Sequence, residues 1–401
     1  MKVAVIGGGP SGMMAAYFAA KNKNQVSLYE KNEKLGKKLF ITGKGRCNIT
    51  NAKDISEFFD QVSRNSKFLY SAFYSFTNLD MIDLLNNNGV PTQVERGDRV
   101  FPKSNKSSDV IKVYEKLLSK ENVNVLLNTE VKSLVKKDEK FYINKNQVYD
   151  KVIVATGGIS YQGTGSTGDG YKFAKSFSIK TTDLKAGLIP IELNDDFIKD
   201  LQGLALKNVE LIAEFDKKKK HTEFGELLFT HFGISGPTVL TMSNIINRAN
   251  NIKLYLDLKP ALDFQKLDNR LVRDFDNYKN KIISNALDDL LPKKLIDPIL
   301  KLAGFSGKEV VNEITKEKRH DLVRVIKKMP LSYKKLFDIN AAIITSGGID
   351  IKEIDSSTME SKKVEGLYFC GEVLDIDAFT GGYNLQIANS TGFLAGNSIT
   401  D

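Results

Sequence analysis

The feature that most constrains this chain is a cluster of glycines directly after its first apolar run. Residues 2–6 (KVAVI) have the continuous apolar character of a buried parallel strand, and the six residues 7–12 (GGGPSG) follow at once. Apolar positions at helical spacing continue to Lys21, and residues 25–30 predict a second strand. A strand, a glycine turn, a helix and a strand in this order predict a dinucleotide-binding βαβ unit.

The residue types in this turn have defined roles in such a unit. Gly7 permits the tight turn, Gly9 allows a pyrophosphate to approach the backbone, and Gly12 allows the helix to pack on the strand. The helix start at Pro10–Ser11 directs free N–H groups and the positive end of the helix dipole at the phosphates. Glu30 ends the second strand, where its carboxylate can accept hydrogen bonds from a ribose diol. We therefore expect all these residues to bind the cofactor.

Two later elements favour FAD over NAD alone. Residues 152–158 predict a strand that ends in the turn Ala155-Thr156-Gly157, and residues 366–372 predict another strand, which ends at Gly371-Glu372. A helix that starts within residues 381–386 could direct its N–H groups at the flavin and stabilise negative charge there. An enzyme that uses only NAD needs no third element so far along the chain, so FAD is the favoured cofactor.

The length and the order of elements predict several domains. A chain of 401 residues is long enough for two or three. From residue 188 the pattern changes to antiparallel strands, residues 263–328 are helical, and strands return at residues 341–345. This order predicts an α/β fold in which a Rossmann-like domain is interrupted by an insertion.

Composition excludes several classes of protein. Two cysteines cannot form a disulfide framework and are typical of a reducing cytoplasm, where we expect this protein. Three histidines and no Cys/His cluster with ligand spacing predict no metal site. The longest apolar stretch near the N-terminus is too short to span a membrane. The formal net charge is +9, but its most conspicuous run, Lys217–Lys220, predicts a solvated hairpin tip, so the sequence favours a small-molecule substrate over nucleic acid.

Four elements give the chain a specific resemblance to a known family. Residues 42–51 (TGKGRCNITN), 230–237 (THFGISGP), 345–349 (TSGGI) and 371–386 are similar to elements of the BaiN-type flavoproteins, the aminoacetone-oxidase family of FAD-binding enzymes. They occur in family order and span essentially the whole chain. Lys44 stands where many relatives have glycine, a departure that concerns one loop.

The resemblance implies a flavoprotein of three domains, in agreement with the order of elements. These are a discontinuous FAD-binding domain of the two-dinucleotide-binding type (residues 1–187 and 346–401), an inserted β-barrel-like domain (188–258 and 320–345) and a small helical domain (259–319). It also implies an oxidoreductase that uses FAD, with NADH or NADPH as the electron donor.

The resemblance further assigns cofactor contacts by position. Beyond the residues already named, those expected to line FAD are Lys31, Lys38, Gly43, Arg46, Cys47, Val131, Glu372, Asn384, Leu385 and Gln386. Val131 is expected to contact adenine through its backbone, while Glu372 and the residues that start the last helix approach the ribityl chain and the isoalloxazine ring. A second glycine motif, residues 163–168, has no strand ending in an acid after it, so we interpret it as a loop leading to a helix around residues 171–176.

The sequence leaves the catalytic residue and the substrate open. Tyr383, His231 and Cys47 are the candidate proton donors. The leading hypothesis is flavin-mediated hydride transfer to a small organic substrate. The alternatives are a flavin-dependent enzyme that modifies tRNA, motivated by the net charge, and a non-catalytic flavin-binding redox or interaction protein. The oligomeric state stays open.

Overall fold

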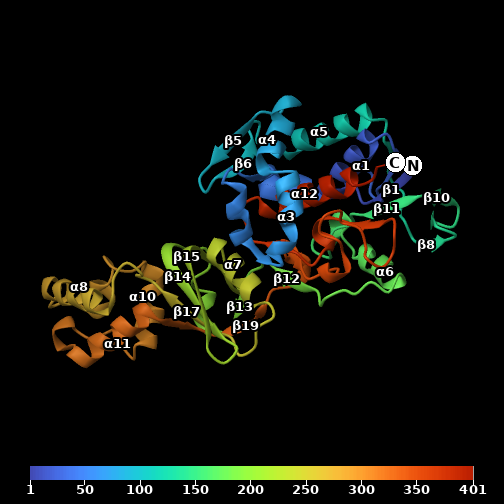
Figure 1. Ribbon diagram of the computed structural model, residues 1–401. Coiled ribbons are helices and arrows are strands. Elements are labelled where there is room, and N and C mark those ends of the chain that lie inside the picture. Colours follow the sequence, from blue (N-terminus) through green and yellow to red (C-terminus); the bar gives the residue numbers. More distant parts are fainter. Residues whose placement is uncertain (401) are drawn as a thin grey trace. The chain divides into compact units, whose positions relative to one another are not determined.

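The computed structural model describes residues 1–400, which form two compact units (Figure 1). The first unit contains residues 1–187 together with the chain from Ile339 onward, and the second contains residues 188–338. In the described part of the chain, no helix is both long and apolar enough to cross a membrane.

A five-stranded parallel sheet forms the centre of the first unit. Its strand order is β21-β11-β1-β2-β7, and every neighbouring pair is parallel. The strands are β1 (Lys2–Ile6), β2 (Gln25–Tyr29), β7 (Asn124–Leu126), β11 (Lys151–Val154) and β21 (Leu367–Phe369). The parallel order brings the three strands that precede the predicted cofactor elements, β1, β11 and β21, side by side. This confirms the predicted Rossmann-type α/β domain.

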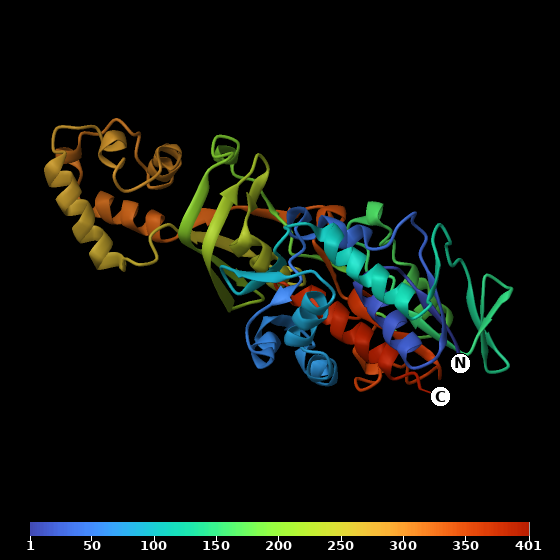
Figure 2. The same ribbon diagram turned by 90° about the horizontal axis from the view of Figure 1, so that it is seen from above.

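Two helices from distant parts of the chain pack together in this unit, and α1 lies directly on the sheet. Helix α1 (Pro10–Lys21) and helix α12 (Tyr383–Asn397) lie side by side in both views (Figures 1 and 2). Glycines permit their close approach, because a Cβ at Gly392 would lie 2.3 Å from the backbone oxygen of Ser11, and one at Gly396 would lie 2.3 Å from that of Ala15. Sequence pattern alone did not predict this backbone-to-backbone contact.

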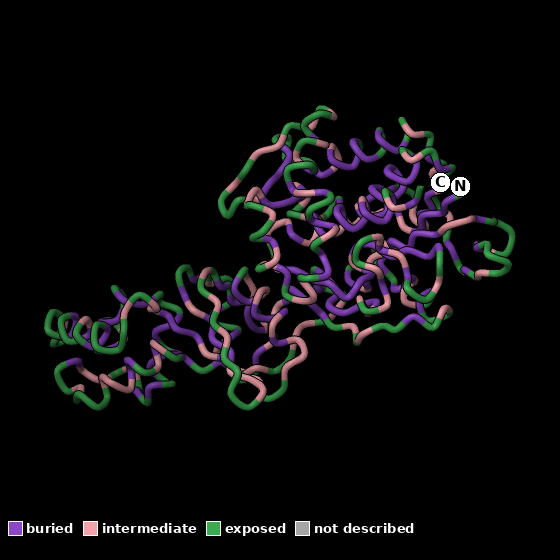
Figure 3. Tube along the Cα trace, viewed as in Figure 1, coloured by how far each residue is buried: buried purple, intermediate pink, exposed green. Residues whose placement is uncertain are grey.

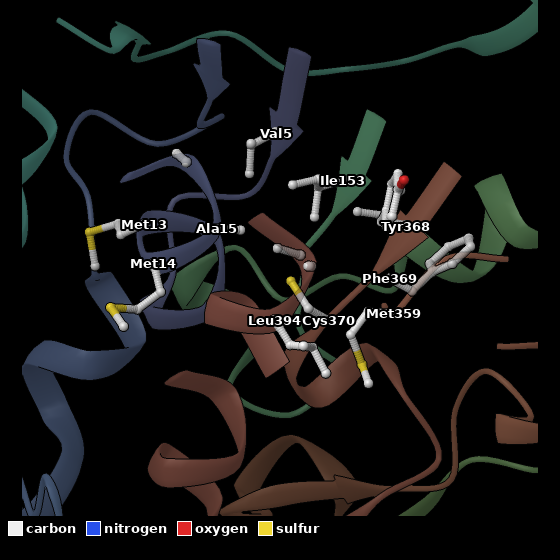
Figure 4. Packing of buried hydrophobic residues seen from close by; sticks show 14 of the residues in the cluster. Val5, Met13, Met14, Ala15, Ile153, Met359, Tyr368, Phe369, Cys370 and Leu394 are labelled. Atoms are coloured by element: carbon white, nitrogen blue, oxygen red, sulfur yellow. The ribbon is translucent and has the colours of Figure 1, made fainter. Parts of the chain in front are cut away.

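The core of the first unit lies between the sheet and these helices. Buried stretches follow the parallel strands and both helices in Figure 3, and Figure 4 shows the side chains of Val5, Ile153, Met13 and Phe369 within one apolar cluster. Strands β1 and β11 are apolar throughout their buried positions because both faces of a parallel sheet are covered.

Smaller elements complete the first unit. Strands β3 (Thr50–Asn51), β6 (Arg99–Pro102) and β5 (Thr92–Glu95) form one sheet, and strands β8 (Leu134–Lys137), β9 (Lys140–Ile143) and β10 (Gln147–Tyr149) form another. The two-stranded pairs are β4 (Val62–Arg64) with β22 (Asp377–Ala378), and β12 (Lys185–Gly187) with β20 (Ile344–Ser346). The helices are α2 (Lys37–Ile41), α3 (Tyr70–Ser75), α4 (Asn78–Asn87), α5 (Ser107–Lys120) and α6 (Asp169–Ser176).

The second unit is a seven-stranded antiparallel sheet with helices. Its strand order is β18-β17-β14-β15-β16-β13-β19. The strands are β13 (Ile191–Leu193), β14 (Ala205–Phe215), β15 (Lys219–Phe229), β16 (Gly233–Ser235), β17 (Lys253–Asp257), β18 (Met329–Leu331) and β19 (Tyr333–Leu336). The helices are α7 (Pro237–Ile246), α8 (Phe264–Asn277), α9 (Ile283–Ala286), α10 (Lys293–Leu302) and α11 (Lys316–Lys327). Lys217–Lys220 are exposed at the β14–β15 hairpin, as predicted.

The structure draws two boundaries differently from the sequence-based division. Residues 339–345 belong to the first unit, because β20 pairs antiparallel with β12 and so returns the chain to the Rossmann domain before residue 346. In the second unit, Leu271 and Leu295 from the helices share one buried apolar cluster with Leu211 and Leu256 from the strands. The helical region 259–319 therefore packs as part of the same unit as the sheet.

Candidate cofactor site

The glycine turn after β1 has the geometry that a pyrophosphate requires. Gly7 has φ +111°, and a Cβ there would lie 2.4 Å from the backbone oxygen of Ala155, while a Cβ at Gly12 would lie 1.9 Å from the oxygen of Gly7. A Cβ at Gly9, in contrast, has no neighbour within 4 Å. The turn is thus closed on the protein side and open at Gly9, and the Ser11 and Gly12 N–H groups start helix α1 beside that open position.

Glu30 is fixed at the end of β2 by three hydrogen bonds. Its Oε2 accepts from the Gly8 N–H at 2.8 Å, and its Oε1 accepts from the backbone and the side-chain nitrogen of Asn32 at 2.8 and 2.7 Å. The Thr129 N–H donates to the Glu30 carbonyl at 2.9 Å, which places the segment leading to the buried Val131 beside the end of β2. The structure therefore brings the expected ribose and adenine contacts to one edge of the sheet.

Lys31 connects this edge to the second glycine motif. Its Nζ donates to Thr167 Oγ1 at 2.5 Å and to Asp169 Oδ2 at 2.8 Å. Burial raises the pKa of Asp169, but hydrogen bonds from Lys172, Lys31 and Thr167 outweigh it and hold that pKa at about 2. The motif at residues 163–168 leads directly into α6, which confirms that it is a loop before a helix.

Glu372 collects hydrogen bonds from three separate segments. Its Oε2 accepts from Lys38 Nζ at 2.7 Å, and its Oε1 accepts from the Thr345 N–H at 2.9 Å and from Ser160 Oγ at 3.1 Å. Lys38 also donates to Ser160 Oγ at 2.6 Å. Lys38 and Glu372 were expected at the cofactor. Ser160 and Thr345 were not named as cofactor contacts, although Thr345 begins the motif at residues 345–349 and Ser160 lies two residues after Gly158.

Two buried hydroxyl groups at this end of the sheet have no protein partner. Thr156 Oγ1 and the Tyr171 hydroxyl are enclosed and make no hydrogen bond to residues 1–400. Burial, together with the negative charges of Glu372 and Asp375, raises the pKa of Tyr171, so its hydroxyl keeps its proton. Because buried hydroxyls nearly always have a partner, these two are available to a bound molecule.

The start of helix α12 packs against strand β3. Gly382 has φ +102°, and a Cβ there would lie 2.3 Å from the Thr50 oxygen. The Asn384 amide is occupied by Ala378, accepting from its N–H at 2.9 Å and donating to its oxygen at 2.7 Å. The buried Gln386 amide is likewise bonded to Thr50 Oγ1 at 2.7 Å and to the Phe76 oxygen at 3.1 Å. Both side chains are thus occupied by protein partners. The backbone N–H groups of the first turn, from Tyr383 to Leu385, are the groups that this helix start can offer to a cofactor.

The loop of residues 42–47 contains three further predicted contacts. Gly43 has φ +57° and lies over Phe101, with a Cβ position 3.3 Å from that ring. Arg46 donates to both carboxylate oxygens of Glu95 at 2.8 and 3.0 Å and stacks on Phe101 at 4.1 Å, so its charge is balanced within the protein. Cys47 is fully buried, and burial raises its pKa to about 12, which keeps it a neutral thiol.

The three candidate proton donors lie in different environments. Tyr383 is almost fully buried at the first position of α12, and burial raises its pKa. Cys47 is enclosed in the core of the first unit, whereas His231 is exposed in the second unit and makes an edge contact with Phe232. Tyr383 and Cys47 therefore belong to the first unit, and His231 belongs to the second.

The residues present fit an adenine dinucleotide. An open glycine turn at a helix start, a fixed carboxylate after β2, and unpartnered hydroxyls meet at the carboxyl ends of β1, β2 and β11. Gly371 joins them, because a Cβ there would lie 2.4 Å from Ser11 Oγ. Ligands of open parallel sheets bind at this end of the strands.

Comparison with known proteins gives matches over nearly the whole chain. The family profile described as "HI0933-like protein Rossmann domain" matches residues 1–398. The ribosomal RNA dihydrouridine synthase of Haemophilus influenzae is 32% identical, covering 99% of this chain and 98% of that protein, and the Escherichia coli enzyme of the same name is 31% identical, covering 97% and 95%. The 3-dehydro-bile acid delta(4,6)-reductase of Clostridium scindens is 28% identical, covering 100% and 99%.

Solved structures agree on the fold. The 3-ketosteroid delta1-dehydrogenase of Sterolibacterium denitrificans superimposes with a TM-score of 0.53 at 13% identity, covering 98% of both chains. This likeness supports the architecture, and the full-length sequence matches confirm the family that motifs such as residues 42–51 and 371–386 indicate. The chain belongs to the HI0933-like family of FAD-dependent oxidoreductases.

Proposed function

We propose that this enzyme reduces a carbon–carbon double bond conjugated to a carbonyl group, and that its substrate is uridine in ribosomal RNA. The observation that carries the proposal is the pair of full-length relatives named ribosomal RNA dihydrouridine synthases, at 32% and 31% identity. Dihydrouridine is uridine whose C5–C6 double bond, conjugated to the C4 carbonyl, has been reduced. The name of the bile acid reductase describes the same kind of bond, which supports one shared chemistry.

The balance of the reaction defines what the protein must supply. A hydride adds to one alkene carbon and a proton to the other, and NADH or NADPH is the proposed source of the electrons. FAD, when bound, supplies the hydride. The open turn at Gly9 and the Ser11 N–H would hold its pyrophosphate, Glu30 would hold its ribose, and the first turn of α12 would offer positive potential to the reduced ring.

We propose Tyr383 as the group that delivers the proton. Cys47 and Tyr383 are both buried in the first unit and His231 belongs to the second, so the choice rests on where each residue stands in the fold. Tyr383 stands at the first position of α12, which is the element that faces the flavin in this proposal. A phenol with a raised pKa holds its proton at neutral pH and can donate it to a developing carbanion.

The Tyr383→Phe variant tests this role. We expect alkene reduction to fall by about 10²- to 10⁴-fold, with flavin reduction by the nicotinamide unchanged. Tyr333→Phe is the control, because it removes a partly buried phenol with a raised pKa from β19 in the second unit. Equal loss of both half-reactions would assign Tyr383 a structural role instead.

The substrate is tested by incubating the FAD-loaded enzyme and each nicotinamide with ribosomal RNA. The RNA is taken from cells that lack the gene for this enzyme, so that the target uridine is unmodified. The expected product is dihydrouridine, detected by nucleoside mass spectrometry as a gain of two hydrogens, with transfer RNA as the comparison substrate. Modified transfer RNA with unmodified ribosomal RNA would overturn the choice of RNA. A bound flavin that neither nicotinamide reduces would favour a non-catalytic flavin-binding protein.

A second candidate function is reduction of a small conjugated ketone. The bile acid reductase, 28% identical over the full length, is the observation that favours it. Competition between ribosomal RNA and a steroid enone in one reaction compares their kcat/KM values directly. A higher kcat/KM for the enone would replace the RNA proposal with this one.

A further inference from the structure

We infer that the first unit carries an RNA-binding surface made of Lys44, Arg96, Arg99, Lys103 and Lys106, here called the basic surface. The inference rests on the proposed function and adds to it the place where the RNA backbone docks. These residues belong to the loop before β3, to the β5–β6 hairpin and to the turn that leads into α5. All lie within one unit.

The basic surface has an excess of unpaired positive charge. From Arg96 to Lys106 the chain has four basic residues, and Asp98 is its one acidic residue. Lys44, Arg96, Lys103 and Lys106 are exposed, and within residues 1–400 none of the four is in an ion pair. The neighbouring Glu95 is already neutralised by Arg46. Free cations gathered in this way are available to phosphate groups.

Internal contacts hold the three segments together as one surface. Arg46 stacks on Phe101 at 4.1 Å and donates to Asn105 Oδ1 at 3.2 Å, which ties the loop before β3 to the hairpin and to the turn after it. Arg99 lies over the same ring at 5.8 Å. The Lys103 N–H donates to the Pro91 oxygen at 2.8 Å and so fixes the turn against the base of the hairpin.

The basic surface adjoins the start of α12. One side-chain nitrogen, Nδ2 of Asn51, donates both to the Gly97 oxygen at 3.0 Å and to the Gly381 oxygen at 3.1 Å. The Ala52 N–H donates to the Asp98 oxygen at 2.7 Å. The tip of the hairpin is therefore bonded to the strand that packs on α12, the element proposed to face the flavin. RNA bound on this surface lies next to the site where its base reacts.

Exposed apolar side chains beside the cations favour RNA with unpaired bases. Phe40 is 47% exposed and Ile41 is 42% exposed, and Ser107 Oγ donates to the Phe40 oxygen at 2.7 Å, which places them at the start of α5. Lysines with an exposed aromatic ring suit a single-stranded segment, because phosphates contact the cations and a base can stack on the ring. The green stretches at the β5–β6 hairpin in Figure 3 show how much of this region is exposed.

The test compares two triple variants that remove the same charge. Arg96→Gln/Lys103→Gln/Lys106→Gln alters the basic surface, and Lys217→Gln/Lys218→Gln/Lys220→Gln alters the exposed β14–β15 hairpin as the control. Affinity of the FAD-loaded enzyme for ribosomal RNA is measured across a salt series. Each lost phosphate contact should lower the slope of log affinity against log salt by about 1, so we expect a tenfold or greater loss of affinity for the first variant only.

The readouts separate failure of this inference from failure of the proposed function. Flavin reduction by the nicotinamide and thermal unfolding should match the wild type in both variants, and the KM for RNA should rise with kcat retained. Wild-type protein that neither binds nor reduces RNA overturns the proposed function. Wild-type activity with equal affinity loss in both variants overturns the basic surface. If the Arg96/Lys103/Lys106 variant binds RNA as the wild type does but binds anionic phospholipid vesicles more weakly, the basic surface is a membrane-binding surface instead.

Discussion

Lys38 and Glu372 form an ion pair of 2.7 Å although 334 positions separate them in the sequence. Each comes from an element expected at the cofactor, and each is less than one-quarter exposed. Their partners Ser160 and Thr345 come from two further segments. One partly buried charge pair therefore joins four stretches of chain at the end of the parallel sheet.

The Glu372→Gln variant tests the importance of this pair. It keeps the shape of the side chain but leaves Lys38 without its counter-charge. Charge-assisted hydrogen bonds contribute about 1.5–3 kcal/mol to stability, and because this pair joins the segments of the proposed cofactor site, we expect its loss to weaken FAD binding as well. Flavin fluorescence titration measures it, with Glu57→Gln at an exposed pair as the control. An unchanged FAD dissociation constant would show that Glu372 does not contribute to cofactor binding.

Substitutions in the glycine turn should separate cofactor binding from folding. Gly9→Ala places a methyl group where no protein atom lies within 4 Å, so the fold should stay intact while FAD binding weakens by about tenfold or more. Gly12→Ala places one 1.9 Å from the Gly7 oxygen and should reduce the free energy of unfolding by about 1–3 kcal/mol. Calorimetry without cofactor and FAD titration provide the two measurements. Equal destabilisation by both changes would contradict the open position at Gly9.

Both thiols should be inert in the folded protein. Burial raises the pKa values of Cys47 and Cys370 from 9.0 to about 12, so neither forms a thiolate at pH 8. A thiol reagent should label no cysteine in the native enzyme and two after denaturation.

The same shifts predict how stability depends on pH. A raised pKa contributes stability that is complete below pH 9 and is lost between pH 9 and about 12, because the unfolded chain releases its thiol protons first. The free energy of unfolding should therefore fall less steeply in this window for Cys47→Ala/Cys370→Ala than for the wild type. Equal slopes of the free energy of unfolding against pH for the two proteins would contradict the raised cysteine pKa values.

The Arg64–Asp375 pair should contribute far more to the free energy of unfolding than a surface ion pair does. Arg64 donates to both Asp375 oxygens at 2.5 and 2.9 Å, and the aspartate side chain is only 3% exposed. Arg64→Met leaves a buried charge unpaired and should lower the free energy of unfolding by about 3–5 kcal/mol. Arg324→Met, at an exposed pair with Asp321, should change it by about 0.5 kcal/mol or less. Chemical denaturation of both variants gives the comparison.

Local determinants explain what could be predicted from the sequence. The turn at residues 7–12, the acid Glu30 and the helix start near Tyr383 depend on neighbouring residues, and the structure places all three where the motifs indicate. Gln386 shows the limit, because the motif marks its position while its side chain bonds Thr50, far away in the chain.

Contacts between distant segments explain the features that could not be predicted from the sequence. The partner of Arg46 is Glu95, and no local pattern near either residue identifies the other. The same holds for Asn51, whose two acceptors lie on the β5–β6 hairpin and just before α12. The boundary expected at residue 346 lies at residue 339 in the structure. The reason is that the three residues of β20 pair with β12, which is far away in the sequence.

The glycine contacts between α1 and α12 also predict when the proposed cofactor site can first form during synthesis. A ribosome that adds about 5–20 residues per second makes α12 roughly 20–70 seconds after α1. During that interval residues 188–338 emerge and can pack their own core, while α1 still lacks the partner against which Gly392 and Gly396 fit. The proposed nucleotide site is therefore completed only after α12 has been made, and we expect loading with FAD to follow that step.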